Sequence, residues 1–440
     1  MLTLLCLLFL LPVEYGVSAS TGLRSWQLDT NNRSTWDIVS EAREQIMCVR
    51  TWLIALLVPE LILGFGFLEL FNVINSRARY NVVQAEAKSR RQARSGSHGG
   101  LRNEPFDGAQ ENPDSAKWTF TQTFCINAGG LALQTQDDWI YTVTCEDEMV
   151  LLIQSGMVSP LDLRERDIQE HAKQDWLGKL FTLLQVSWFI CNIITRWASH
   201  VSVSPFKLAT VAYCFLGIVI YGFWWFKPKD MGAPIIVPLH YDRDNLPGEL
   251  HDAMHSAGWT HRLAPLKEER ILLIAWDAMK TPFLSEDGED LELLKERPVE
   301  TPSWIIHIVV ILFGLTGLSY CGIHIAAWDY TFPTRAEWIS WIVFCFTAVA
   351  GVCIFSTVNT AYLALLHLKV AKKLPSSMEF LVEDTHWQRI FDTHMYIKQA
   401  GISLYIIARL GIMALVCSSL RALPEDSYTT VGWVTSIPHF

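Results

Sequence analysis

Two charged residues occur inside apolar runs that are long enough to cross a membrane, and they are the first candidates for chemistry. Glu60 follows Pro59 in the run 52–71, and Arg409 occurs in the run 401–420. Counting about 1.5 Å per residue from one end of each run places both residues ~12 to 17 Å deep. Glu60 is therefore a candidate catalytic proton donor. The favoured alternative is an ion pair between the two residues, because buried charges are usually paired.

A stripe of polar residues follows the apolar run 180–198. Its members recur at three- and four-residue steps: Gln185, Trp188, Asn192 and Arg196. This spacing places them on one helix face, which is predicted to contact protein or a cavity. Hydrogen bonding between helices is the favoured interpretation, because Asn and Gln commonly join transmembrane helices. The alternative is the polar wall of a cavity for a lipophilic substrate.

A third set of residues marks the end of the apolar run 208–226. Trp224, Trp225 and Lys227 occur at this end. Tryptophan rings favour the headgroup region, and a lysine head remains near water while its stem lies along apolar surface. We interpret these three residues as interface anchors. Glu69 is near the same boundary and is expected to be solvated.

Histidine and cysteine spacing indicates no metal site and no cofactor. His251 and His255 have the i,i+4 spacing that places two imidazoles on one helix face, but third and fourth ligands are not evident. The chain has ten cysteines and no paired CxxC pattern, and those within the apolar runs are interpreted as small buried hydrophobic residues. His324 and Asn359 lie near the ends of apolar runs, where contact with the interface suffices.

The elements that must position these residues are predicted to be transmembrane helices. Six runs approach the twenty or so residues that a span requires: 52–71, 180–198, 208–226, 304–326, 338–363 and 401–420. Half of the 440 residues are hydrophobic and 18% are charged, which excludes an ordinary soluble enzyme. The net charge of -10 lacks the basic face that nucleic acid requires. We predict an all-α membrane protein with about six transmembrane helices and partly structured cytosolic segments.

The N-terminus resembles a secretory signal. Residues 2–12 are apolar, and small residues follow up to Ala19, so residues 1–19 are predicted to be a cleavable signal peptide. A short signal anchor is the alternative, since no basic residue precedes the apolar stretch. Cleavage would leave residues 20–51 in the lumen, where Asn32 begins a usable glycosylation sequon.

Basic residues predict the orientation, because short cytoplasmic loops carry the excess of lysine and arginine. The connecting segments rich in these residues are 72–179, 227–303 and 364–400, and they are predicted to be cytosolic. The opposite loops contain only Lys207 and Arg335. A lumenal N-terminus and a lumenal tail at 421–440 follow, in the endoplasmic reticulum or a later secretory membrane.

Composition subdivides the cytosolic segments. Residues 88–102 are basic and rich in Ser and Gly, which predicts a linker beside the anionic leaflet. Aromatic and apolar residues from 118 onward indicate a structured part, with a helix at 148–156 and an amphipathic approach at 165–176. Residues 364–400 are interpreted as a short connection without recognisable chemistry.

Several motifs resemble those of a known group. They are Lys173-Gln174-Asp175-Trp176-Leu177-Gly178-Lys179, Leu184-Gln185-Val186-Ser187-Trp188-Phe189, Arg196, Tyr221, Trp224-Trp225 and Lys227-Pro228-Lys229-Asp230, with Trp36-Asp37-Ile38, Val58-Pro59-Glu60 and Trp118-Thr119 earlier in the chain. Together they resemble an uncharacterised multi-pass integral membrane protein family of filamentous fungi. The resemblance covers most of the chain and implies no settled biochemical activity. Some fungal multi-pass proteins act in secondary-metabolite pathways.

Three classes of function follow. A structural or interaction role in the endomembrane system is favoured, because it requires only the spans and the cytosolic segments. The alternative is an intramembrane, terpene-cyclase-like enzyme that acts on a lipophilic metabolite of fungal secondary metabolism. Glu60 would be its acid, and Trp188, Trp224 and Trp225 would stabilise cations. A transporter is the third class, although the sequence shows no convincing repeat of broken spans. The expected partners are the lipid bilayer and, in the enzyme alternative, a lipophilic small molecule.

Overall fold

Six long helices make up most of the residues that the computed structural model describes. It describes residues 55–97, 117–143, 146–172, 176–228, 234–246, 303–330, 332–370, 384–424 and 427. The long helices are α4 (Pro59–Ser97), α8 (Trp176–Ala198), α9 (Pro205–Phe223), α13 (Ser303–Ile325), α14 (Arg335–Val370) and α15 (Asp384–Ser419). Each is long and apolar enough to cross a membrane, and each overlaps one of the six predicted runs. The prediction of a mostly helical chain with six such helices is therefore confirmed.

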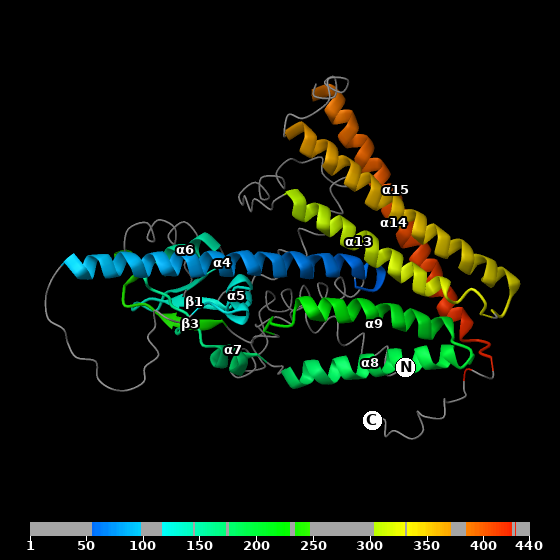
Figure 1. Ribbon diagram of the computed structural model, residues 1–440, viewed down its shortest axis with the longest axis horizontal. Helices are drawn as coiled ribbons and strands as arrows, with labels where there is room; N and C mark the ends of the chain where they lie inside the picture. The colour runs from blue at the N-terminus through cyan, green and yellow to red at the C-terminus, as the bar shows by residue number, and fades with distance from the viewer. Residues whose placement is uncertain are drawn as a thin grey trace, which may run out of the picture.

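Local sequence explains how the α8–α9 hairpin is delimited. Ser204 caps α9, because its hydroxyl accepts a hydrogen bond from the Lys207 amide at 3.4 Å, and Pro205 occupies the first turn. At the other end the chain leaves α9 in a turn in which the Lys227 amide donates to the Trp224 carbonyl at 3.0 Å. The short connection after α8 makes the two helices antiparallel neighbours (Figure 1).

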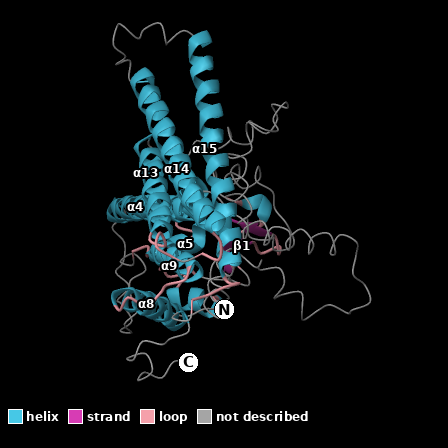
Figure 2. Cartoon of the chain, turned by 90° about the vertical axis from the view of Figure 1, so that its right-hand side faces the viewer, coloured by secondary structure: helices cyan, strands magenta, loops and turns pink. Residues whose placement is uncertain are grey.

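The helices form two groups that meet along α9 and α13. α4, α8 and α9 run nearly side by side, while α14 and α15 form a long antiparallel pair that crosses them obliquely (Figures 1 and 2). Glycine allows the backbones of this pair to touch. A Cβ added to Gly351 would lie 2.8 Å from the Gly401 carbonyl oxygen. Such close approach through small residues is the usual way in which helices pack in membranes.

A small α/β domain surrounds the second half of α4 at one end of the molecule (Figure 1). Its elements are α5 (Phe120–Asn127), β1 (Leu131–Gln134), β2 (Ile140–Thr142), α6 (Glu146–Ser155), α7 (Glu165–His171), β3 (Ile235–Pro238) and the short 3-10 helix η1 (Arg243–Asn245). The sheet order is β2-β1-β3. β1 pairs with β2 antiparallel and with β3 parallel. The described part is thus not purely α-helical, which corrects the all-α prediction for the segments outside the long helices.

This composite domain, as we call it, combines segments that the sequence separated. Its core contains Tyr80 and Val83 from α4, Trp118, Leu133 from β1, and Val237 from β3. β3 follows α9 in the chain, whereas β1 precedes α8. The predicted segments 72–179 and 227–303 therefore contribute to one hydrophobic core.

Two predicted boundaries differ from the observed helices. α4 continues without interruption to Ser97, so residues 88–97 of the predicted linker are helical; their Ala, Lys, Arg and Gln content favours a helix. α14 extends to Val370 and α15 begins at Asp384, so much of the predicted connection 364–400 is helical. Hydropathy marks only the apolar part of such helices, whereas the polar extensions are stabilised by pairing. Tyr362 of α14, for example, stacks on His394 of α15 with ring centroids 4.2 Å apart.

Candidate functional site

Glu60 and Arg409 form a buried ion pair. Arg409 Nη1 lies 2.8 Å from Glu60 Oε1, and the two side chains are 2% and 0% exposed. The Tyr405 hydroxyl donates to the same carboxylate oxygen at 2.7 Å. Arg409 Nη2 donates to the Tyr213 hydroxyl at 3.2 Å, and that hydroxyl donates in turn to the Leu56 carbonyl at 2.5 Å. The pairing interpretation of these two charges is therefore confirmed.

Aromatic rings complete this site. The Arg409 guanidinium lies 3.7 Å above the centroid of the Tyr320 ring and within 6 Å of the rings of Tyr213 and Tyr405. A cation is attracted to the face of an aromatic ring, and more strongly where water is excluded. We call Glu60, Tyr213, Tyr320, Tyr405 and Arg409 the Glu60 cluster. It joins α4, α9, α13 and α15.

The sequence explains part of this geometry. Glu60 lies in the first turn of α4, directly after Pro59, where the helix dipole stabilises a negative charge. Tyr405 precedes Arg409 by four residues, so both side chains project from the same face of α15. That i,i+4 spacing is the signal by which Tyr405 was detectable. Tyr213 and Tyr320 lie in other helices, and nothing in the sequence connects them to Glu60.

Two polar atoms in this region have no hydrogen-bond partner among the described residues. They are Glu60 Oε2 and His324 Nε2, and both are buried. His324 is completely buried and packs on Tyr320, with ring centroids 4.2 Å apart. Its side chain therefore contacts protein, whereas contact with the interface was expected. The carboxylate thus has one oxygen held by two donors and one oxygen that remains an open acceptor.

Trp224, one of the tryptophans assigned to a cyclase, contacts Glu69 and not Glu60. The Trp224 indole donates to Glu69 Oε2 at 2.8 Å, and Lys227 Nζ lies 3.0 Å from Glu69 Oε1. Glu69 lies about 13 Å further along α4 than Glu60. Its side chain is 15% exposed, so the expectation of a solvated Glu69 is wrong.

These residues instead form a joint between the long helices and the composite domain. Lys179 Nζ, at the start of α8, donates to the Trp225 and Lys227 carbonyls at 2.8 and 3.0 Å and so caps the end of α9. Trp224 is only 3% exposed. The interpretation of Trp224 as an anchor in the headgroup region is therefore corrected: the ring packs within the protein. Glu69, Lys179, Trp224 and Lys227 are called the boundary joint below.

Phe226 continues this contact into the composite domain. Its ring stacks on that of Phe120 at the start of α5, with centroids 5.4 Å apart. The Arg77 guanidinium of α4 lies 4.3 Å from the centroid of the same Phe120 ring.

The polar stripe of α8 does not act as one surface. Arg196 is buried and its Nη2 donates to the Ser202 carbonyl at 3.2 Å and to the Ser427 carbonyl at 3.4 Å. Gln185 is exposed, and Asn192 is half-buried. No side-chain hydrogen bond joins Asn192 to another described residue. Arg196 therefore makes the buried protein contacts that were expected of the stripe.

Cysteines and histidines do not gather into a metal-ligand group in the described ranges. No group of three or more His, Cys, Asp or Glu side chains there is close enough to bind one. Cys125, Cys214, Cys321 and Cys345 are buried, as interpreted, but Cys191, Cys353 and Cys417 are exposed. Asn32, the predicted signal peptide, His251 and His255 lie outside the described residues.

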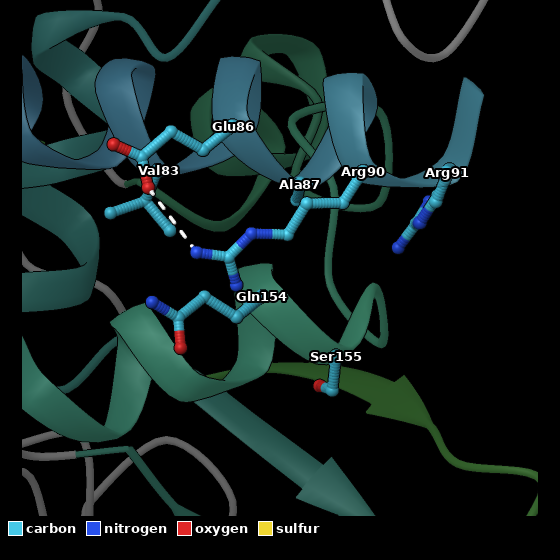
Figure 3. Close-up of a pocket in the computed structure, with 7 residues that line it drawn as sticks. All are labelled: Val83, Glu86, Ala87, Arg90, Arg91, Gln154 and Ser155. Atoms are coloured by element: carbon cyan, nitrogen blue, oxygen red, sulfur yellow. Dashed lines mark ion pairs between the residues drawn. The ribbon is translucent and has the colours of Figure 1, made fainter. Parts of the chain in front are cut away.

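Two cavities of about 280 Å³ each are defined by described residues away from the Glu60 cluster. The first lies between α4 and α6 and is lined by Val83, Glu86, Ala87, Arg90, Arg91, Gln154 and Ser155 (Figure 3). Arg90 extends across it and lies 3.9 Å from Glu86. The second is lined by His386, Arg389, Ile390 and Thr393 of α15. None of the predicted site residues lines either cavity.

Comparison with known proteins identifies a family but no activity. No curated protein and no solved structure matches the chain significantly. A family profile matches residues 40–247 and 306–440, which together make up more than half of the chain. The chain belongs to that family, a family of unknown function (DUF8562).

Proposed function

We propose that the chain is a multi-pass protein of the endoplasmic reticulum or later secretory membranes with a structural or interaction role. The Glu60–Arg409 pair is the observation that carries this proposal. Its ionic groups and two tyrosine hydroxyls bind one another across α4, α9 and α15. This arrangement neutralises the charges and holds helices together, which suits a scaffold better than a reaction centre.

The orientation that we propose has a signal peptide at 1–19, a lumenal N-terminus, a cytosolic composite domain and a lumenal tail. Pairing of β1 with β3 supports the central part of this topology. These strands flank the α8–α9 hairpin in the chain, so both ends of the hairpin emerge on the side of the composite domain. The basic residues of the connecting segments favour the cytosol for that side.

Glycosidase digestion and protease protection test the orientation. In microsomes, the wild-type chain should carry a glycan that is removed by glycosidase and is absent from Asn32→Gln. The composite domain should be digested by added protease, and the glycosylated N-terminus should be protected. A chain without glycan, or a protected composite domain, would contradict the proposed orientation.

The second candidate is an intramembrane enzyme that acts on a lipophilic metabolite. The unpartnered, buried Glu60 Oε2 favours it, because an open carboxylate oxygen can exchange a proton with a bound molecule. Metabolite profiles of cells that lack the protein, or that carry Glu60→Gln, separate the two candidates. Glu69→Gln is a matched control from the same helix. Loss of one product at normal Glu60→Gln protein level would establish the enzyme, and an unchanged profile supports the structural role.

A further inference from the structure

α8 is the most peripheral of the long helices. It packs chiefly against α9 and lies at the edge of the helical group (Figure 1). Large apolar side chains on its other side are exposed, among them Phe181 at 68% and Leu184 at 57%. Apolar exposure alone would only indicate contact with lipid. The polar residues on this side of α8 are more informative.

Asn192 places a half-buried, unsatisfied amide within the apolar part of α8. It lies about 20 Å beyond Lys179 along the helix axis, which is inside a hydrocarbon core about 30 Å thick. Its side chain has no hydrogen-bond partner among the described residues. Asn359 of α14 shows the usual solution, because its amide donates to the Phe355 carbonyl at 2.7 Å and its oxygen contacts His394 at 3.2 Å. Without water, an unpaired amide is costly.

The outward side of α8 also follows a heptad pattern. Phe181, Leu184 and Cys191 are exposed and Thr195 is half-buried, and the four fit the alternating three- and four-residue steps of a coiled-coil seam. In this register, Trp188 and Cys191 both occupy seam positions. Ser187 directly precedes Trp188, and Asn192 directly follows Cys191, so the two polar residues flank the seam on opposite sides. Parallel coiled coils bring such flanking residues of two helices together when they are five positions apart. Ser187 and Asn192 have that separation.

We propose that this face of α8 binds α8 of a second copy of the chain. Two copies in one membrane have the same orientation, so their α8 helices are parallel and related by a two-fold axis. Ser187 of each copy then faces Asn192 of the other, and the hydroxyl and amide groups can both donate and accept hydrogen bonds. Because of the two-fold symmetry, the Asn192 amide of each copy gains a hydrogen-bond partner. The small Ser187 and Cys191 side chains allow the two helices to approach closely. The inference rests on the proposed membrane placement of α8.

Cross-linking of the full-length protein in native membranes tests whether the partner of α8 is a second copy of the chain. Cys191 lies in the seam, so a short bifunctional maleimide should join two chains into a covalent dimer. Cys191→Ala should abolish this dimer, and Cys353→Ala, which removes an exposed cysteine of α14, should not. A dimer that forms without Cys191, or a Cys191 adduct with a different protein, would overturn the proposal.

Substitution of Asn192 tests the interaction itself. In lipid nanodiscs, Asn192→Leu should weaken dimerisation about tenfold, the effect of losing two interhelical hydrogen bonds. Asn192→Gln keeps the amide and should retain most of the dimer. Thr347→Leu is the matched control, because the exposed Thr347 hydroxyl bonds to Val343 of its own helix. Dimerisation of Asn192→Leu at the wild-type level would contradict the proposal.

Alkaline carbonate extraction distinguishes failure of the proposed dimer from failure of the proposed membrane placement. A chain that is retained in membranes but is monomeric overturns the dimer and leaves the proposed membrane placement intact. A chain that carbonate releases overturns the membrane placement, and the dimer with it.

Discussion

Removing both charges of the Glu60–Arg409 pair is expected to destabilise the protein less than removing either one. The two side chains are almost completely buried, and the Nη1 and Oε1 atoms are 2.8 Å apart. Removing one partner of such a pair leaves an uncompensated charge, which costs ~3 to 5 kcal/mol of stability. Glu60→Leu and Arg409→Met should each lose about this much stability.

The double variant Glu60→Leu/Arg409→Met leaves no unpaired ion. Replacing a buried ion pair with apolar groups of similar volume is often nearly neutral. If the two single losses were independent, they would sum to ~6 to 10 kcal/mol. We therefore expect a coupling energy of at least ~3 kcal/mol between the two positions.

Equilibrium denaturation by dodecyl sulfate in bicelles at pH 7 measures the stability of the three variants relative to the wild type. The double variant should be more stable than either single variant. A double variant whose loss equals the sum of the two single losses would refute the reasoning.

Three further predictions concern other parts of the molecule. Lys227→Met should destabilise the boundary joint by ~1 to 2 kcal/mol, because the largely buried Glu69 carboxylate loses its cationic partner. Proteolysis of the composite domain should therefore be faster in Lys227→Met, and Lys227→Arg should retain the resistance of the wild type. Gly401→Val should destabilise the α14–α15 pair by ~1 to 3 kcal/mol or more, because a Cβ at this position would lie 3.1 Å from the Gly351 carbonyl oxygen. Gly322→Ala is the control in the same denaturation assay, since a Cβ added there has no atom within 4 Å. Burial raises the pKa of the Cys125 thiol from 9.0 to about 12, so the contribution of this thiol to stability should be present below pH 9 and be lost as pH rises towards 12. Maleimide should label Cys125 at pH 8 only after the protein unfolds. Rapid labelling of the folded protein would contradict the burial of this thiol.

The composite domain also constrains the order of folding. Its strand β3 follows the α8–α9 hairpin, whereas β1 and β2 precede it. A parallel β1–β3 pair needs a long crossover, and here the hairpin forms most of that connection. The three-stranded sheet therefore cannot be completed until α9 has been synthesised and its end has reached the boundary joint.

Some of the candidate site could be predicted because the relevant signals are local. A charged residue within an apolar run is conspicuous, which identified both Glu60 and Arg409, and the rule that buried charges are usually paired predicted their contact. Tyr213 and Tyr320 could not be predicted, because aromatic residues are common in apolar helices and carry no sign of a remote partner. Glu69 was misinterpreted for a related reason. Its distance from the centre of the span suggested that its carboxylate contacts solvent, but the carboxylate instead contacts Trp224 and Lys227.

The sequence by itself determined that six apolar helices would form, because helix length and hydropathy are properties of contiguous residues. It also located the charged residues within those helices. Only the tertiary structure decided that Arg409 lies among three tyrosine rings, that β3 joins a sheet begun before α8, and that the Asn192 amide has no hydrogen-bond partner among the described residues. Each of these depends on which helix faces meet, and contacts between faces arise from packing among residues far apart in the chain.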